Sequence, residues 1–394
     1  MDSVANWLVD NKDKIEKAVY ITGEVAEVLA ATVGQLHPLL EAVFSGVAQI
    51  CSNPEGKEAL YLRQKIEQVN QKLVCIQRET DQIALELQRA AMNEQNFDRE
   101  AHILGQYEKF QEFINAKPSM KEEKKETFIT YYKITNTDLN LDALFNAVTG
   151  ENMAGVPILD TVVVTAKRSR RAVEDFCARL KKLFVMGLIA IMGYTALREG
   201  PVETGLTTKW HERMEAVEKL MKAAVDQCTE NFMDQAKLDL EEALKEKASC
   251  AVSEDLTRSL LSALVKKYDW VNWSVRAFNS RERIFFYNWL AGCKCHGSAG
   301  ANWFKLTMDN KVKVVVSFCV DPPPIDKTRI SKQIEQQRLK GNMMAVARMV
   351  NRCFPDCLVH AVSHHKEVVE SNNFNVESYY YARQKRAFFY IHPL

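Results

Sequence analysis

Residues 183–197 read LFVMGLIAIMGYTAL, a run of fifteen residues without a charged side chain, and a strongly basic segment leads directly into them. This run decides the fold because it can lie in the core of a helical bundle, bind at a membrane surface or span a membrane, and each alternative implies a different architecture. A transmembrane helix needs about 20 apolar residues to cross a core of roughly 30 Å, whereas fifteen helical residues extend only about 22 Å. A buried bundle helix, a segment that enters membranes conditionally and a single span therefore stay open.

Charge is distributed unevenly along the 394 residues. The formal net charge of the whole chain is +1, but residues 1–267 carry a net −7 and residues 268–394 a net +8. This asymmetry predicts two domains with opposite electrostatic character. A hydrophobic content of 47% is sufficient for each domain to form a core.

The acidic domain, residues 1–267, is predicted to be helical almost throughout and to form an elongated antiparallel bundle of long helices. Long helices are expected at about 158–198 and 207–248, with shorter ones between 96 and 150. One segment has apolar or small residues separated alternately by four and three positions, as in a coiled coil. The members of this repeat are Leu62, Ile66, Val69, Leu73, Ile76, Thr80, Ile83, Leu87 and Ala90. Packing within the chain is the preferred interpretation of the repeat, and a dimeric zipper is the alternative.

The basic domain, residues 268–394, begins where tryptophan becomes frequent and alternation replaces the helical period. Asp309-Asn310 separates two alternating stretches and predicts a β-hairpin. The pattern indicates a small α+β domain with an antiparallel sheet. Its expected elements are strands at 304–308, 311–320, 357–362, 379–382 and 387–391 and a helix at about 326–352.

Two sets of residues are candidates for contact with a membrane. The apolar candidates are Leu183, Phe184, Val185, Met186, Leu188, Ile189, Ile191, Met192, Tyr194 and Leu197. The basic flank consists of Arg168, Arg170, Arg171, Arg179, Lys181 and Lys182. If the run enters lipid, these cations would hold its start at an anionic surface. Gly187 and Gly193 would allow neighbouring helices to approach closely.

The sequence contains none of the phosphate-binding, dinucleotide-binding, esterase or zinc-protease motifs. We therefore predict no catalytic residue, no cofactor and no enzymatic activity. Cys293, Cys295, His296, Cys319, Cys353 and Cys357 have a spacing that is unusual for zinc, so ordinary thiols are expected there. The aromatic and cationic stretch 379–390 is interpreted as a hairpin; nucleic acid is not an expected partner, although an anionic lipid or polyanion remains open.

The N-terminus has no basic segment followed by an apolar one, so no secretory signal is predicted, and the expected location is cytoplasmic or membrane-associated. The expected partners are an unidentified protein and an anionic membrane. Self-association into an oligomer stays open.

The string RSRRAVEDFCARLKKLF, residues 168–184, followed by GLIAIMGYTAL, resembles the rapunzel and rapunzel-like proteins of fish. The resemblance extends to EVAEVLAATVGQLHPLLEAVF, INAKPSMKEEKKETF and LDALFNAVTGENM, and so covers most of the helical half. The cephalotoxin-like proteins with long helices are more distantly similar. This resemblance implies a non-enzymatic role in fin and skeletal development, including ossification.

The combined expectation is a developmental interaction protein that associates with membrane through residues 183–197. A soluble helical scaffold whose apolar helix stays buried is one alternative. A protein that inserts into membranes in the manner of helical pore-formers is another.

Overall fold

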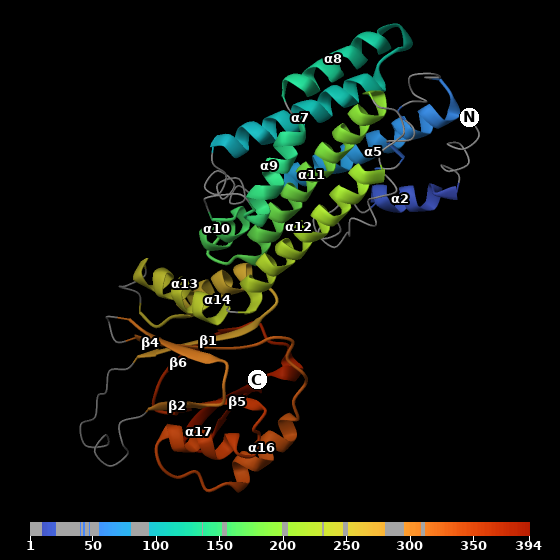
Figure 1. Cartoon of the computed structure of the whole chain (residues 1–394). Helices are drawn as coiled ribbons and strands as arrows, with labels where there is room; N and C mark the ends of the chain where they lie inside the picture. The colour runs from blue at the N-terminus through green and yellow to red at the C-terminus, as the bar shows by residue number, and fades with distance from the viewer. Residues whose placement is uncertain are drawn as a thin grey trace. The chain divides into compact units, whose positions relative to one another are not determined.

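The chain folds as two compact units, Met1–Glu230 and Asn231–Leu394, in the computed structural model of Figure 1. The residues that the structure describes are 10–20, 40, 42–43, 47, 55–79, 94–135, 137–151, 156–198, 204–230, 232–246, 251–279, 295–308 and 312–394. Most of residues 1–54, the second half of the coiled-coil repeat and the Asp309-Asn310 turn lie outside this set. The mainly α prediction, with an α+β part at the C-terminal end, is confirmed.

Helices make up the described elements of the first unit. They are α2 (Lys12–Tyr20), α5 (Lys57–Glu79), α7 (Glu94–Asn115), the short η1 (Pro118–Met120), α8 (Lys121–Ile134), α9 (Thr137–Thr149), α10 (Ile158–Thr165), α11 (Arg170–Arg198) and α12 (Thr204–Glu230). The sequence Lys117-Pro118 separates α7 from α8, because proline removes a backbone donor and disfavours helical backbone in the residue before it.

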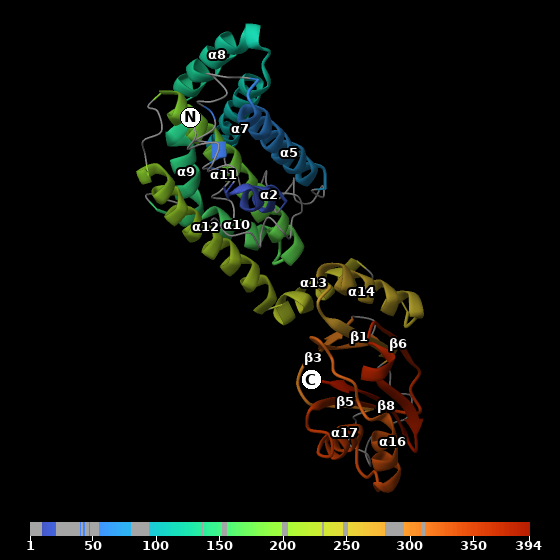
Figure 2. The same ribbon diagram turned by 90° about the vertical axis from the view of Figure 1, so that its right-hand side faces the viewer.

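The central element of the first unit is α11, which carries the uncharged run. It contacts α5, α7, α9, α10 and α12, and Figure 2 shows it surrounded by these helices. Leu62, Ile66 and Val69 of α5 are fully buried in the same hydrophobic cluster as α11. This part of the 3.5-residue repeat therefore packs within the chain.

The predicted helix over 158–198 is wrong in one respect, because a tight turn divides it into α10 and α11. Lys167 and Arg168 adopt left-handed backbone with φ of 47° and 57°. The amide of Lys167 donates to the carbonyl of Val164, and that of Arg168 to Val163. This pair of hydrogen bonds is the Schellman pattern that ends helices. The basic cluster at 167–171 consequently lies at a helix junction.

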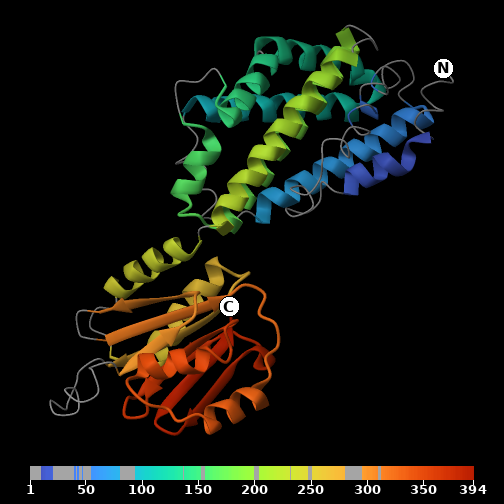
Figure 3. The ribbon, with the colours of Figure 1, turned by 60° about the horizontal axis from the view of Figure 1, so that its bottom comes forward.

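The second unit is built around two antiparallel sheets of four strands (Figure 3). The first sheet has the order β3-β4-β1-β6 and the second the order β2-β5-β8-β7. The strands are β1 (Asn272–Asn279), β2 (His296–Ala299), β3 (Trp303–Thr307), β4 (Val312–Cys319), β5 (Cys357–Ser363), β6 (Val368–Asn372), β7 (Tyr380–Gln384) and β8 (Ala387–Pro393). The predicted pairing of β3 with β4 is present, as is the β7–β8 hairpin.

Helices cover the outer faces of both sheets, so the second unit has four layers. The helices are α13 (Phe232–Glu246), α14 (Glu254–Lys267), α16 (Lys327–Gln336) and α17 (Met343–Asn351). Contacts place α14 on β1 and β6, α13 on β3, α17 on β2 and β5, and α16 on β7. The inner faces of the two sheets meet each other, as shown by the hydrogen bond of 2.8 Å between His392 on β8 and Ser317 on β4.

Further expectations differ from the structure. The helix expected over 207–248 consists of α12 and α13, and the one expected over 326–352 is divided at Gly341, whose φ is +86°. Strands β1, β2 and β6 were not predicted. The compact units divide after Glu230, whereas the predicted boundary follows residue 267. The difference arises because α13 and α14 bury their apolar faces on the first sheet.

Candidate functional site

The candidate site is the uncharged segment 183–197 of α11, which is apolar around its circumference and packs against neighbouring helices. Every residue from Leu180 to Gly193 is buried. All the apolar membrane-contact candidates lie in this core except Tyr194 and Leu197, which are partly buried and pack against it. Such a helix belongs inside a protein or a membrane. Among the described helices, α11 alone has the length and composition to cross a membrane, with a mean hydropathy of 1.6 over a window that is 83% buried.

Two glycines allow other helices to lie close against α11. A Cβ atom at Gly193 would fall 2.3 Å from the ring of Phe110 on α7. At Gly187 it would fall 2.7 Å from Leu141 on α9. Distances this short do not occur between real side chains, so both positions require glycine unless the neighbours move. The small residues that the sequence suggested for packing in lipid thus pack inside this unit.

Aromatic rings complete the cover at the C-terminal end of α11. Tyr194 stacks on Tyr132 of α8, with ring centroids 3.8 Å apart and planes inclined by 5°. Tyr132 in turn contacts Phe128, and Phe128 contacts Phe110 at 5.3 Å. Aromatic pairs of this kind add to the stabilisation that comes from burial alone.

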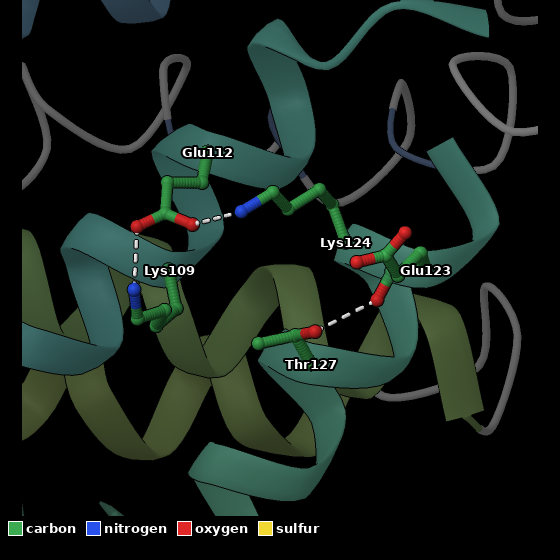
Figure 4. A network of polar contacts seen from close by, with 5 residues as sticks. All are labelled: Lys109, Glu112, Glu123, Lys124 and Thr127. Carbon is green, nitrogen blue, oxygen red and sulfur yellow. Dashed lines mark hydrogen bonds and ion pairs between the residues drawn. The ribbon is translucent and has the colours of Figure 1, made fainter. Parts of the chain in front are cut away.

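Polar contacts on the surface hold α8 against α7 (Figure 4). The Glu112 carboxylate on α7 accepts from Lys124 of α8 at 2.8 Å and also from Lys109. These two cations lower the pKa of Glu112 by direct hydrogen bonding. The Thr127 hydroxyl donates to the carbonyl of Glu123 within α8. Because all these groups are partly exposed, the network positions α8 without adding much stability.

Half of the basic flank points into the protein. Arg179 donates to Glu100 on α7 at 2.9 Å, and the Lys181 ammonium lies 2.7 Å from the Glu218 carboxylate on α12. The side chain of Lys181 is 0% exposed. Charges buried in this way need a partner, because leaving water costs several kcal/mol for each ion. These cations therefore join α11 to its neighbours and are unavailable to lipid headgroups in this conformation.

Burial also alters the titration of the two adjacent lysines. Desolvation lowers the pKa of Lys182 to about 8, with the Arg179 cation acting in the same direction and the Glu100 carboxylate opposing it. Desolvation likewise lowers the pKa of Lys181, and the hydrogen bond with Glu218 opposes that shift. Both directions follow from placing an ammonium group among apolar side chains.

The remaining cations of the flank are accessible. Arg171 is exposed, while Arg168 and Arg170 are half-buried. Arg170 pairs with Glu174 one turn along α11, at 3.9 Å. The accessible basic surface therefore consists of the helix junction and the first turn of α11.

Glu218 is the functional residue that sequence reasoning missed. It lies on the same face of α12 as Met214, Val217 and Met221, which are all buried. Spacings of three and four residues place side chains on the same face of a helix. An acidic residue on an apolar face is a signal for a buried partner, but the partner's identity depends on the packing of α12 against α11.

The cysteines and the C-terminal aromatic stretch show no assembled site. No group of three or more potential metal ligands occurs among the described residues, and Cys293 lies outside them. Cys295, Cys319, Cys353 and Cys357 are free thiols. In the 379–390 stretch, the β7–β8 hairpin buries Tyr379, Tyr380, Phe389 and Tyr390 and exposes Tyr381 and Arg383.

Comparison with known proteins agrees with this helical architecture. Residues 52–249, which are half of the chain, match the cephalotoxin-like middle helical domain. The chain belongs to this cephalotoxin-like family. Protein rapunzel of Danio rerio is 25% identical over 224 residues, which cover 57% of this chain and 98% of that protein. No solved structure matches the chain.

Proposed function

We propose that this protein is a non-enzymatic developmental protein whose helical unit associates with anionic membranes when α11 is released from the core. Its membership of the cephalotoxin-like family and its similarity to Protein rapunzel support the non-enzymatic, developmental part. Fin and skeletal development, including ossification, is the proposed process. An unidentified protein partner, self-association and a cytoplasmic or membrane-associated location belong to the same proposal.

The observation that carries the membrane part is that residues 183–197 of α11 carry no charge, while Arg179 and Lys181 just before them join α11 to other helices by ion pairs. Fifteen uncharged residues are too few for a comfortable span. Conditional insertion at the surface suits this length better than a permanent span. Arg168, Arg170 and Arg171, at the helix junction and in the first turn of α11, are exposed or half-buried and would face anionic headgroups at a membrane surface.

The Lys181–Glu218 pair offers a direct test, because removing one partner leaves a buried charge. We expect Glu218→Gln to destabilise the helical unit by about 3 kcal/mol. The variant should therefore bind phosphatidylserine vesicles more strongly than the unmodified protein does, as measured by co-flotation. Glu215→Gln is the matched control, because Glu215 lies on the same helix with its side chain 64% exposed, and it should behave as the unmodified protein.

A double variant distinguishes the release of α11 from general unfolding of the helical unit. Lys181→Met combined with Glu218→Leu removes both charges, and replacement of a buried ion pair by apolar groups is often neutral or stabilising. Its stability and its low vesicle binding should return towards those of the unmodified protein. If Glu218→Gln unfolds the helical unit without any gain in vesicle binding, the membrane proposal is wrong and the alternative of a soluble scaffold is supported.

A further inference from the structure

The layer between the two sheets of the second unit contains several buried polar side chains beside a small apolar cluster that includes Val362, Phe374 and Tyr390. Strand β1 contributes Ser274 and Arg276 to this layer, β4 contributes Ser317, and β5 and β8 contribute His360 and His392. All five side chains are completely inaccessible. By contrast, the apolar clusters of this unit lie mainly on the outer faces of the sheets, beneath the helices.

Arg276 is a buried cation whose donors are only partly used. Its Nη2 donates to the Ser317 hydroxyl, which also bonds to His392. The guanidinium lies 5.3 Å from the ring centroid of Tyr390. Its Nε and Nη1 have no hydrogen-bond partner among the described residues. Arginine stays charged in proteins, and the three N–H donors on these two nitrogens are left without a hydrogen-bond partner in this layer.

Other unpartnered polar atoms lie on the second sheet. They are Nδ1 of His296, both ring nitrogens of His360 and the hydroxyl of Ser298, again as judged against the described residues. The β2–β5 register places Ser298 opposite His360, and the rings of His296 and His360 are 5.6 Å apart. The ring of Tyr390 links this group to Arg276, because its centroid lies 5.9 Å from that of His360 and 5.3 Å from the guanidinium.

The charges around these donors are predominantly positive. Besides desolvation, the pKa of His296 is lowered by Lys313, Lys305 and Arg276. Lys305 is exposed and Lys313 half-buried, so cations extend from the outer edge of the layer to its interior. The environment therefore favours a negatively charged group.

Glu370 on β6 makes no direct ion pair with Arg276. It lies opposite Arg276 in the β1–β6 register, but its Oε1 accepts from Ser274 at 2.6 Å and from Tyr379. No ion pair within 4 Å joins it to Arg276 among the residues described. This carboxylate is thus engaged by two hydroxyl groups in preference to the guanidinium.

We propose that the inter-sheet layer of the second unit binds a phosphate group through Arg276, His296, Ser298 and His360, with Lys305 and Lys313 at its outer edge. Arg276 offers two adjacent donors, an arrangement that suits oxyanions. Phosphate is favoured over a carboxylate because the hydroxyl and imidazole groups add further donors, which a third oxygen would satisfy. Convergent polar groups of this kind fix the orientation of small ligands.

Thermal unfolding and calorimetry of the full chain test this proposal with inorganic phosphate. Phosphate should stabilise the second unit relative to chloride at matched ionic strength, and acetate should do so much less. Ser298→Ala should weaken phosphate binding about tenfold, because it removes a hydrogen bond to a charged group, while leaving the fold intact. Arg276→Met should abolish binding. Arg352→Met is the control, because Arg352 is exposed at the end of α17.

A second experiment, which measures binding to lipid vesicles, distinguishes two sources of the phosphate group. A soluble phosphate monoester is the source if inorganic phosphate binds and vesicles of phosphatidic acid bind no better than phosphatidylcholine vesicles. A lipid headgroup is the source if phosphatidic acid vesicles bind and Arg276→Met or Ser298→Ala reduces that binding. The proposal is overturned if phosphate and chloride act alike and vesicle binding is insensitive to both variants. It is also overturned if Ser298→Ala binds phosphate as tightly as the unmodified protein, whatever happens to the fold of Arg276→Met.

Discussion

The core around α11 and the layer between the two sheets both bury ionisable side chains. They differ in whether a buried group has an oppositely charged partner. In the helical unit, Lys181 has a carboxylate from a neighbouring helix within ion-pair distance. In the second unit, His360 and His392 are held in a setting that opposes their protonation, with Arg276 as the nearby charge. Pairing keeps a charge inside the protein, whereas burial without a counter-charge keeps the group neutral. The two regions should therefore respond to different perturbations.

The largest expected effect is a loss of stability at low pH that affects the second unit more than the helical unit. Burial lowers the pKa of His392 to about 3 and that of His360 well below its usual value. Both imidazoles are neutral in the folded and unfolded chain above the unfolded pKa of about 6.5. Below it the unfolded chain binds more protons, so stability falls as pH falls. Two such groups remove about 4 kcal/mol between pH 7 and pH 5.

Urea unfolding at both pH values measures this effect. Tryptophan fluorescence reports mainly on the second unit, and far-ultraviolet circular dichroism reports mainly on the helices. Lys182, with a pKa near 8, is already charged at pH 7, so acid adds no proton there. Replacing His360 and His392 by Gln should flatten the pH dependence. An unchanged fluorescence midpoint at pH 5 would contradict the assignment of neutral buried histidines.

Close packing around α11 supplies the next largest effect. Gly193→Ala should destabilise the helical unit by about 1–3 kcal/mol, because its Cβ would meet the ring of Phe110. Gly205→Ala on α12 is the matched control, because nothing lies within 4 Å of its Cβ position. That change should stabilise the helix by about 0.5 kcal/mol through reduced backbone entropy of the unfolded chain. Equal midpoints in thermal unfolding for both variants would show that α11 and α7 are not packed this closely.

A helix cap in the second unit gives the smallest effect. The Ser253 hydroxyl accepts from the amide of Leu256 at 3.2 Å and begins α14. Ser253→Ala should cost about 1 kcal/mol. Ser262→Ala, at an exposed interior position of the same helix, should not destabilise. The loss is expected in the fluorescence transition of the second unit, and a loss confined to the helical unit would contradict the placement of α14 on the sheet.

Features that depend on neighbouring residues in sequence were predictable. The Ser253 cap, the end of α11 at Arg198 and the β7–β8 hairpin all follow from local backbone chemistry and alternation. The turn at Lys167 and Arg168 was not predictable in the same way. Left-handed backbone usually requires glycine, and neither residue is one. Gly341-Asn342 did offer a signal for a break, which the apolar spacing of the surrounding residues obscured.

The candidate site was predictable only where it depends on residues that are close in sequence. Hydropathy identified residues 183–197 as the most apolar helix segment, and that holds in the structure. Whether Lys181 and Lys182 point to solvent could not be read from their own neighbours in sequence. Their burial depends on α7 and α12. Glu100 on α7 lies 82 positions before Lys182, and Glu218 on α12 lies 37 positions after Lys181.

The sequence by itself determined that a long uncharged helix exists, that helices precede strands, and that the chain resembles rapunzel and cephalotoxin-like proteins. These conclusions rest on composition, periodicity and strings of residues, which are properties of the chain in any conformation. Only the tertiary structure decided that α11 lies in the core and that Lys181 pairs with Glu218. It alone revealed that Arg276 lies between two sheets among histidines. Burial and pairing depend on which elements pack together, and no local pattern specifies that.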